Sequence, residues 1–239
     1  VMPEFFHPTI QSWFRNELGK PTLAQLNAWP AIARGEHTLL LAPTGSGKTL
    51  AAFLVAINRL MFQHDQSETD SRPPGVSVLY ISPLKALGVD VERNLQRPLL
   101  GIQQMADAGD QSFRTPTVAI RSGDTEPAER RRIAKNPPDI LITTPESLFL
   151  ILTSKAREIL ASVDTIIVDE IHSLVASKRG SHLFVSLERL EHLRRRNGPE
   201  RPAAQRIGLS ATQRPLDEVA RLLGGADLTT SAGSPTDPA

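Results

Sequence analysis

Six short apolar segments, each followed by a helical pattern, constrain the fold of this 239-residue chain more than any other feature of its sequence. The predicted strands occupy residues 38–41, 76–81, 117–120, 139–143, 165–168 and 206–209. The predicted helices occupy residues 10–18, 23–33, 50–61, 84–105, 127–134, 145–152, 182–195 and 216–223. Strands with little polar alternation, separated by helices, are typical of a parallel sheet that is covered on both faces. We therefore predict an α/β fold with a mostly parallel sheet and helices on both faces.

A glycine-rich segment, APTGSGKT at residues 42–49, lies between the first predicted strand and the helix that follows it. It satisfies the phosphate-loop pattern, except that Ala42 stands where the pattern has its first glycine. In such a loop, backbone N–H groups converge on an anion, and the next helix adds its positive N-terminal end. Lys48 can reach the β- and γ-phosphates, and the Thr49 hydroxyl can bind Mg²⁺. We predict that a nucleoside triphosphate is bound by Thr44, Gly45, Ser46, Gly47, Lys48 and Thr49.

Two adjacent carboxylates, Asp169 and Glu170, follow the predicted strand at residues 165–168. Like charges are costly to bury side by side, so a cation at this place would explain the pair. We assign Asp169 to holding Mg²⁺, directly or through water, and Glu170 to orienting and deprotonating the attacking water. His172 joins Lys48 and these two acids among the predicted catalytic residues. It either couples the metal site to a neighbouring segment or is simply a polar residue whose hydrogen bonds are made within the protein.

Three further features narrow the choice among triphosphatases. The amide of Gln25 can both donate to and accept from the edge of adenine, which favours ATP over GTP. Ser210 and Thr212 follow a strand, and their hydroxyls can hydrogen-bond to the carboxylates and sense the nucleotide state. The segments SPLKAL (82–87) and TTPES (143–147) follow strands and precede helices. Hydroxyls, backbone N–H groups and helix N-termini there suit a second, extended row of phosphates.

The ordered set of Gln25, TGSGKT, SPLKAL, RSGD, TTPES, DEIH and SAT resembles the first RecA-like domain of a superfamily 2 helicase. Longer strings, including LYISPLKALGVDVERNL and VDEIHSLVASKRGSHL, closely resemble the Lhr family, the large helicase-related proteins of bacteria. The similarity covers nearly all of residues 5–225. It implies a RecA-like P-loop NTPase domain at residues 1–228, including an N-terminal adenine-recognition segment, and a linker or cut domain boundary at residues 229–239.

By position, this resemblance implies that Gln25 reads adenine and that Ser210 and Thr212 link the ATP state to the grip on nucleic acid. The residues expected along the tracking strand of single-stranded DNA are Pro83, Lys85, Ser122, Gly123 and Thr144. Lhr-type proteins are ATP-dependent motors that move 3′ to 5′, unwind duplexes including RNA:DNA hybrids, and are associated with DNA repair. The implied cofactors are ATP and Mg²⁺.

The family resemblance also implies partners. These are single-stranded DNA, or the tracking strand of a DNA/RNA hybrid, and a second RecA-like domain of the same polypeptide. That second domain would bring arginines to the γ-phosphate, and no such arginine motif follows SAT in this chain. We therefore expect the chain alone to bind ATP weakly and to hydrolyse it very slowly.

Composition excludes several other classes of protein. The chain has no cysteine, which excludes disulfides and thiolate-bound metals and is compatible with the cytoplasmic location that we expect. No apolar run approaches the roughly 18 residues needed to span a bilayer, so no membrane partner is predicted.

The formal net charge is only +1, and neutral backbone, Ser and Thr donors are expected to make many of the DNA contacts. A shallow salt dependence of DNA binding follows.

The motifs leave two other functions open. An RNA-directed motor of the DExD/H type shares them, because discrimination of the 2′-hydroxyl depends on contacts that the motifs do not reveal. A regulatory module that binds ATP without motor work would also carry the phosphate loop, although such a module has no need of a base at Glu170. A kinase is disfavoured, since nothing resembles a site for an acceptor substrate.

Overall fold

The predicted strands form one fully parallel sheet in the computed structural model, which describes residues 1–63, 75–175, 177–211 and 216–224. The strand order is β1-β6-β5-β2-β4-β3. The strands are β1 (Thr38–Leu41), β2 (Val78–Ile81), β3 (Val118–Arg121), β4 (Ile140–Thr143), β5 (Thr165–Val168) and β6 (Gln205–Ser210). The prediction of a mostly parallel α/β sheet is therefore confirmed. The linker predicted at residues 229–239 lies outside the described residues.

The register of the strands brings all their carboxyl ends to one edge of the sheet. Leu41 of β1 pairs with Ser210 of β6, and Ile81 of β2 pairs with Val168 of β5. Strands β2, β4 and β3 continue in the same register. Neighbouring strands lie 4.7–4.9 Å apart, so β1 and β5 are separated by about 10 Å. The segments predicted to bind nucleotide follow β1, β6 and β5, and those predicted to bind a nucleic-acid strand follow β2, β4 and β3.

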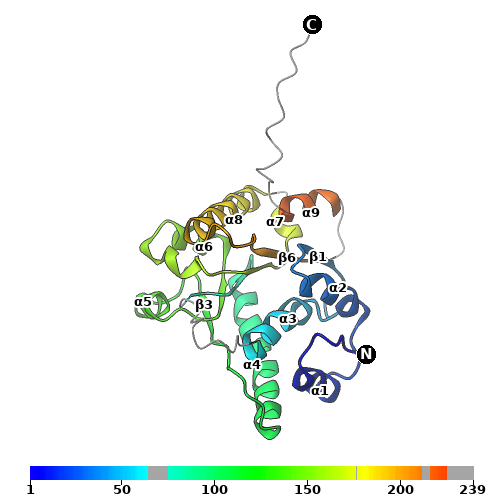
Figure 1. The fold of residues 1–239 in the computed structure, drawn as a ribbon. Coiled ribbons are helices and arrows are strands. Elements are labelled where there is room, and N and C mark those ends of the chain that lie inside the picture. The colour runs from blue at the N-terminus through cyan, green and yellow to red at the C-terminus, as the bar shows by residue number, and fades with distance from the viewer. Residues whose placement is uncertain (64–74, 176, 212–215, 225–239) are drawn as a thin grey trace.

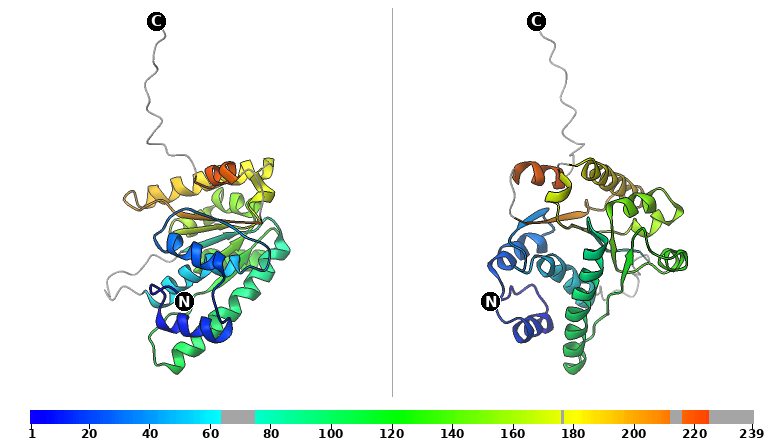
Figure 2. Two further views of the ribbon diagram at one scale, coloured as in Figure 1. Left: turned by 90° about the vertical axis from the view of Figure 1, so that its right-hand side faces the viewer. Right: turned by 180° about the vertical axis from the view of Figure 1, so that it is seen from behind.

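Helices cover both faces of the sheet, as Figures 1 and 2 show. One face carries α1 (Pro8–Glu17), α2 (Leu23–Ala33), α3 (Lys48–Phe62) and α4 (Lys85–Ala108). The other face carries α5 (Pro127–Lys135), α6 (Pro145–Leu152), η1 (Lys155–Leu160), α7 (His172–Val175), α8 (Lys178–Asn197) and α9 (Leu216–Gly224). No helix in these described segments is long and apolar enough to cross a membrane.

The alternation of side chains along each strand divides the core into two clusters. Tyr80 and Ile167 belong to the cluster beneath α1–α4, whereas their neighbours Leu79 and Ile166 belong to the cluster beneath α6–α9. Successive side chains of a strand point to opposite faces, so a strand between two helical layers must be apolar at every position. This requirement explains why the strand segments lack polar alternation.

Two unpredicted helices and one early helix start are the largest differences from the sequence prediction. The short helix α7 and the 3₁₀ helix η1 were not predicted, and α8 begins at Lys178, four residues earlier than expected. Ser177 caps α8, because its side chain accepts a hydrogen bond from the N–H of Gly180 at 3.0 Å. A Cβ atom at Gly180 would lie 1.9 Å from the carbonyl oxygen of Leu174, so only glycine fits where α8 meets α7.

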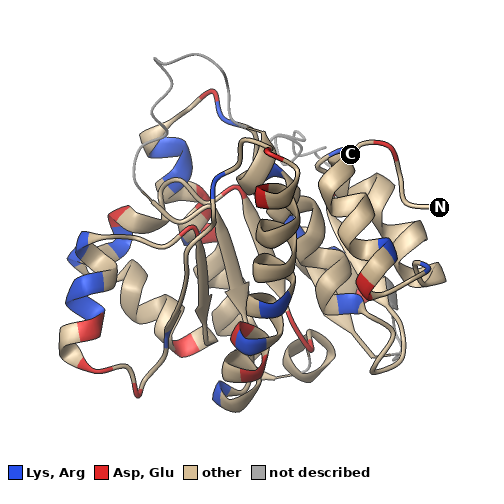
Figure 3. Cartoon of the chain, turned by 90° about the horizontal axis from the view of Figure 1, so that it is seen from below, with Lys and Arg blue, Asp and Glu red and all other residues tan. Residues whose placement is uncertain are grey.

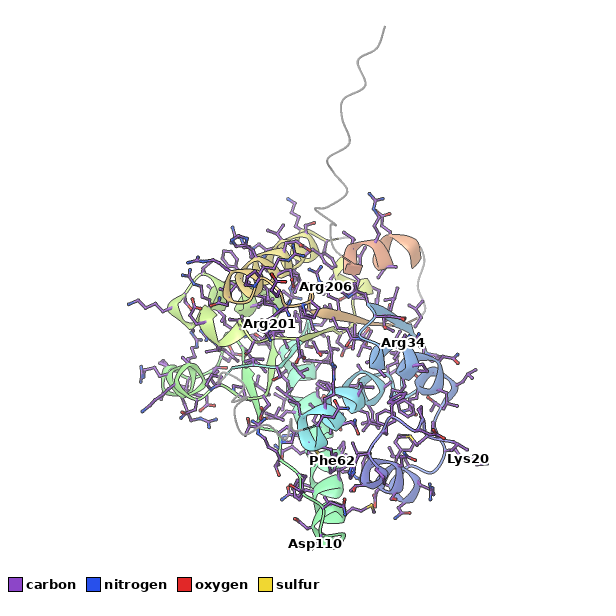
Figure 4. All side chains as sticks on the ribbon, in the orientation of Figure 1. Lys20, Arg34, Phe62, Asp110, Arg201 and Arg206 are labelled. Carbon is purple, nitrogen blue, oxygen red and sulfur yellow. The ribbon has the colours of Figure 1, made fainter. Side chains whose placement is uncertain are left out.

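A buried arginine attaches the last two helices to the sheet. Arg206 of β6 is labelled in Figure 4, beneath α8. Its guanidinium donates to Glu188 of α8 at 2.9 Å and to the carbonyl of Leu223 in α9 at 3.4 Å. Burying this charge is tolerable because it is paired and hydrogen-bonded. The contact holds α8 and α9 against the strand that ends in Ser210.

Candidate nucleotide and nucleic-acid site

The phosphate loop has the backbone geometry that its glycines permit. Gly45 and Gly47 have φ angles of 84° and 79°, a left-handed conformation that glycine adopts at no steric cost. A Cβ atom at Gly47 would lie 2.6 Å from Nε2 of Gln25. The buried hydroxyl of Ser46 has no hydrogen-bond partner among the described residues. A polar cradle without side-chain obstruction therefore lies before α3, and it fits an anionic ligand.

Positive groups gather at the same place. Lys48 is the first residue of α3, and its ammonium donates to the carbonyl oxygens of Ala42 and, at 2.8 Å, Pro43. The first N–H groups of a helix have no acceptor within the helix, and they carry the positive end of its dipole. Thr49 lies in this first turn and is partly buried, whereas Thr44 is exposed in the loop. Such an array suits a phosphate chain.

Gln25 contacts the phosphate loop. It closes a capping box at the start of α2, in which its Oε1 accepts from the N–H of Thr22 at 2.9 Å. Its Nε2 donates to the carbonyl of Gly47 at 3.4 Å, and the Thr22 hydroxyl donates to the carbonyl of Ser46 at 3.0 Å. The amide keeps one further N–H and one further lone pair, although the residue is only 3% exposed. Gln25, which was predicted to read adenine, therefore lies against the phosphate loop.

Asp169 is held by two hydrogen bonds. Its Oδ1 accepts from the N–H of Glu170 at 2.9 Å, and its Oδ2 accepts from the hydroxyl of Tyr80. Burial, together with the charge of Asp169, raises the pKa of Tyr80, so this hydroxyl stays protonated and acts as the donor. Sequence analysis missed Tyr80, which lies within an apolar strand.

Glu170 and His172 connect Asp169 to the end of β6. Glu170 has a φ angle of 46°, which is uncommon for a residue with a side chain and often marks a functional site. His172 lies between two partners: Nε2 is 3.3 Å from Oε2 of Glu170, and Nδ1 is 3.1 Å from Oγ of Ser210. The carbonyl of Ser210 in turn accepts from the N–H of Ala42 at 3.3 Å. His172 therefore contacts two segments of the chain, and Thr212 lies outside the described residues.

No cluster of three or more His, Asp or Glu side chains that could hold a metal occurs in the part of the chain that the structure describes. In phosphate-loop sites, Mg²⁺ is held by one or two protein ligands together with phosphate oxygens and water. The oxygen donors predicted for it are Thr49 and Asp169. Thr49 and Asp169 share no direct hydrogen bond in the part of the chain that is described. Tyr80 connects them, because it stacks on Phe53 of α3 and donates a hydrogen bond to Asp169.

The other half of the edge carries the predicted nucleic-acid residues. Lys85 approaches both carboxylate oxygens of Asp124 at 2.7 Å. Ser122 and Gly123 lie in the turn that precedes Asp124, and the carbonyl of Gly123 accepts from Arg130 at 2.7 Å. A Cβ atom at Gly123 would lie 3.5 Å from Nζ of Lys85. The structure therefore brings three of the predicted residues together, but with Lys85 already paired.

The remaining two predicted residues belong to neighbouring loops. Thr144 caps α6 by accepting from the N–H of Ser147 at 3.3 Å. Pro83 lines a cavity of about 400 Å³, whose wall also includes Glu170 and His172. The nucleotide and nucleic-acid halves of the edge are thus adjacent at this cavity.

Arg121 begins the RSGD motif but was not among the predicted site residues. It ends β3, and its Nη1 atom is buried without a hydrogen-bond partner among the described residues. Burial and the charge of Arg130 lower its pKa, which marks a cation that would gain from an anionic neighbour. Figure 3 shows Lys and Arg interspersed with Asp and Glu over the elements seen from below.

The profile of the DEAD/DEAH box helicases matches residues 22–219, which include both halves of this edge. The chain belongs to this helicase family. The chain is 56% identical over 225 residues to the Lhr helicase/probable uracil glycosylase of Mycolicibacterium smegmatis, a match that covers 94% of the chain and 14% of that protein. It is 50% identical over 226 residues to the Lhr helicase/uracil glycosylase of Escherichia coli, again covering 94% and 14%.

Solved structures give the same relationship. The chain superimposes on Mycobacterium smegmatis helicase Lhr bound to ssDNA and AMP-PNP with a TM-score of 0.82 and 56% identity, covering 91% of the present chain and 26% of the other. The match to the DUF1998 helicase MrfA has a TM-score of 0.74 and 25% identity, covering 93% and 32%. The resemblance to Lhr-type proteins and the RecA-like fold are thus confirmed. The chain spans 14% of the length of the two curated relatives.

Proposed function

We propose that this domain is the N-terminal motor half of an ATP-dependent 3′-to-5′ DNA helicase of the Lhr type, acting in DNA repair in the cytoplasm. The proposed domain comprises residues 1–228, followed by a linker at residues 229–239. One observation carries the proposal. The phosphate loop, the Asp169–Glu170 pair and Ser210 lie on a single sheet edge and are joined by hydrogen bonds and by the 3.3 Å contact between His172 and Glu170. The polarity and the repair role rest on the family resemblance alone.

ATP and Mg²⁺ are the proposed ligands of the nucleotide half. Lys48 and the N–H groups at the start of α3 would bind the β- and γ-phosphates, since they supply positive charge at the glycine cradle. Thr49 and Asp169 would hold Mg²⁺, which neutralises charge on the phosphate oxygens when bound. Gln25 would use its remaining donor and acceptor on the edge of adenine.

Glu170 is the proposed general base. Its side chain is 34% exposed, so it can meet a water molecule, while its backbone N–H is bonded to Asp169. Glu170 would orient the attacking water and take its proton. His172 would orient the carboxylate of Glu170 and couple it to Ser210 through its two ring nitrogens. Thr212 would share this coupling role.

Single-stranded DNA, or the tracking strand of a DNA/RNA hybrid, is the proposed partner of the other half. Ser122, Gly123 and Thr144 offer hydroxyl and backbone donors, and Lys85 and Pro83 lie beside them. Phosphate contacts of this kind position a strand without reading its sequence. Because Asp124 neutralises Lys85, the local charge is small, which supports a shallow salt dependence of DNA binding.

Catalysis would require a second RecA-like domain from the same polypeptide. An arginine supplied to the γ-phosphate contributes roughly 10³–10⁵ in rate in comparable triphosphatases. The 239-residue chain alone is therefore proposed to be nearly inactive. Turnover of the isolated chain above about 1 s⁻¹, the lower end of typical enzyme rates, would contradict this requirement.

A titration with a fluorescent ATP analogue tests the proposal, using the complete polypeptide that contains this chain. Binding should require Mg²⁺ for full affinity and should strengthen when single-stranded DNA is added. The Glu170→Gln variant should keep nucleotide binding and lose hydrolysis. Unchanged hydrolysis would favour a regulatory ATP-binding module, and preferential competition by single-stranded RNA would favour an RNA-directed motor.

A further inference from the structure

Tyr80 of β2 lies next to β5, two residues before the position of Asp169 in the strand register. It is fully buried in β2, and the parallel register places it beside Ile167 of β5. Asp169 follows Ile167 by two positions and therefore faces the same side of the sheet. The hydroxyl of Tyr80 donates to Oδ2 of Asp169 across 89 residues of sequence. An apolar strand thus delivers one polar group to the carboxylate predicted to hold Mg²⁺.

The ring of Tyr80 packs on the helix that follows the phosphate loop. It stacks on Phe53 of α3, with ring centroids 5.2 Å apart and planes 25° apart. Phe53 is four residues after Thr49, so both lie on one face of α3. The side chain of Tyr80 therefore packs against the helix that carries Thr49, and it also hydrogen-bonds to the carboxylate of Asp169.

The hydrogen bonds of Asp169 define the orientation of its carboxylate. Tyr80 occupies Oδ2, and the N–H of Glu170 occupies Oδ1. An ionised carboxylate has about four acceptor sites, so each oxygen retains capacity for a further ligand. Since both oxygens are held from the protein side, the carboxylate cannot turn without breaking a buried hydrogen bond.

We propose that Tyr80 is a positioning residue that orients the carboxylate of Asp169 relative to Thr49, so that the two can take Mg²⁺ together with a nucleotide. This inference rests on the proposed function. Hydrogen-bond partners of metal-binding groups orient their ligands, and losing one typically lowers metal affinity 10–100-fold. A tyrosine needed only for the core would matter through its ring, not its hydroxyl.

The test is Tyr80→Phe in the complete polypeptide, because phenylalanine keeps the ring stacked on Phe53 and removes only the hydroxyl. Binding of a fluorescent ATP analogue is titrated against Mg²⁺ and repeated in EDTA. The half-saturating Mg²⁺ concentration should rise about 10–100-fold, while affinity in EDTA stays unchanged. The matched control is Ser162→Ala, which removes a buried hydroxyl that donates to the carbonyl of Val76 at 2.9 Å, away from the nucleotide edge.

Three results would overturn the inference: an unchanged Mg²⁺ requirement in Tyr80→Phe, an equal loss of affinity with and without Mg²⁺, or the same shift in Ser162→Ala. A wild-type protein that binds no nucleotide under any condition would instead defeat the proposed function. Thermal melting gives a second measurement that needs no nucleotide. Tyr80→Phe should lower the melting temperature less in an Asp169→Asn background than alone, because the charged acceptor is already gone. Additive shifts would also contradict the inference.

Discussion

Nζ of Lys85 lies 2.7 Å from both carboxylate oxygens of Asp124, so the predicted DNA-binding lysine is paired within the protein. Removing the acid should free the ammonium for a DNA phosphate. Exposed ion pairs are worth at most about 1 kcal/mol, so Asp124→Asn should strengthen single-stranded DNA binding by no more than about fivefold. Its slope of log affinity against log salt should steepen by about 0.7, the value for one phosphate contact on a single strand.

Fluorescence anisotropy at several salt concentrations measures both quantities. Glu129→Gln provides a control, because Glu129 pairs with Arg132 on the exposed side of α5 at 2.6 Å. An Asp124→Asn protein with the wild-type salt slope would show that Lys85 does not contact the strand.

His172 connects Glu170 to Ser210, and its removal should uncouple hydrolysis from DNA. His172→Ala is expected to lower the DNA-stimulated ATPase rate more than the rate without DNA, because the contact at 3.1 Å to Ser210 is lost. Ser210→Ala should act in the same direction, and the double variant should lose no more than His172→Ala, since residues in one network are not additive. Steady-state ATPase assays with and without single-stranded DNA decide this. Proportional losses in both conditions would argue against coupling.

Gly47→Ala tests the close packing of the phosphate loop against Gln25. The positive φ angle of 79° makes any side chain there cost roughly 1–2 kcal/mol, and the new Cβ would lie 2.6 Å from Nε2 of Gln25. Gly35 has a φ angle of 81° with nothing within 4 Å, so Gly35→Ala carries the same backbone strain without the contact. Both variants should lower the melting temperature, and only Gly47→Ala should also weaken nucleotide binding. Equal nucleotide affinity in the two variants would contradict a role for the contact.

Glu191 predicts a pH dependence of stability. Burial alone would raise the pKa of Glu191, but the N–H of Ala204 and the guanidinium groups of Arg194 and Arg195 hold it below the ordinary value. A depressed folded-state pKa contributes stability above the unfolded-state pKa, and this contribution is lost as the pH falls through the folded-state pKa. Glu191→Gln should therefore unfold more easily at neutral pH, by about 3 kcal/mol, because Arg194 is left buried without its partner charge.

The difference between Glu191→Gln and the wild type should shrink at acidic pH, where the wild-type carboxyl is also neutral. Chemical denaturation at a series of pH values measures it. Glu158→Gln is the control, because Glu158 is an exposed residue that pairs with Arg157 at 3.1 Å. If the difference in the free energy of unfolding between variant and wild type stays constant from neutral to acidic pH, the charge of Glu191 does not stabilise the C-terminal part of α8.

Local patterns in the sequence were sufficient for several elements. Strands β1 and β5 and helices α2 and α6 have the predicted bounds, because apolar runs, an N-terminal cap and the residue Pro145 act over a few neighbouring positions. The start of α8 was misplaced, although its cap at Ser177 is a local signal, because the helix was predicted from the spacing of its apolar residues alone. The close approach of Gly180 to Leu174 of α7 also fixes this start, and that spacing does not include it.

The sequence by itself determined the α/β class, the phosphate loop and the motif set, because short-range residue spacing encodes them. Only the tertiary structure decided which side chains form hydrogen bonds and ion pairs with one another along the sheet edge. An apolar strand conceals the polar role of Tyr80, whose partner Asp169 comes 89 residues later. Likewise, Lys85 meets Asp124 only because strands β2 and β3, which are not adjacent in the sheet, end at the same edge. Hydrogen bonds and ion pairs act over about 3 Å, and parallel strand order sets those distances independently of separation in the chain.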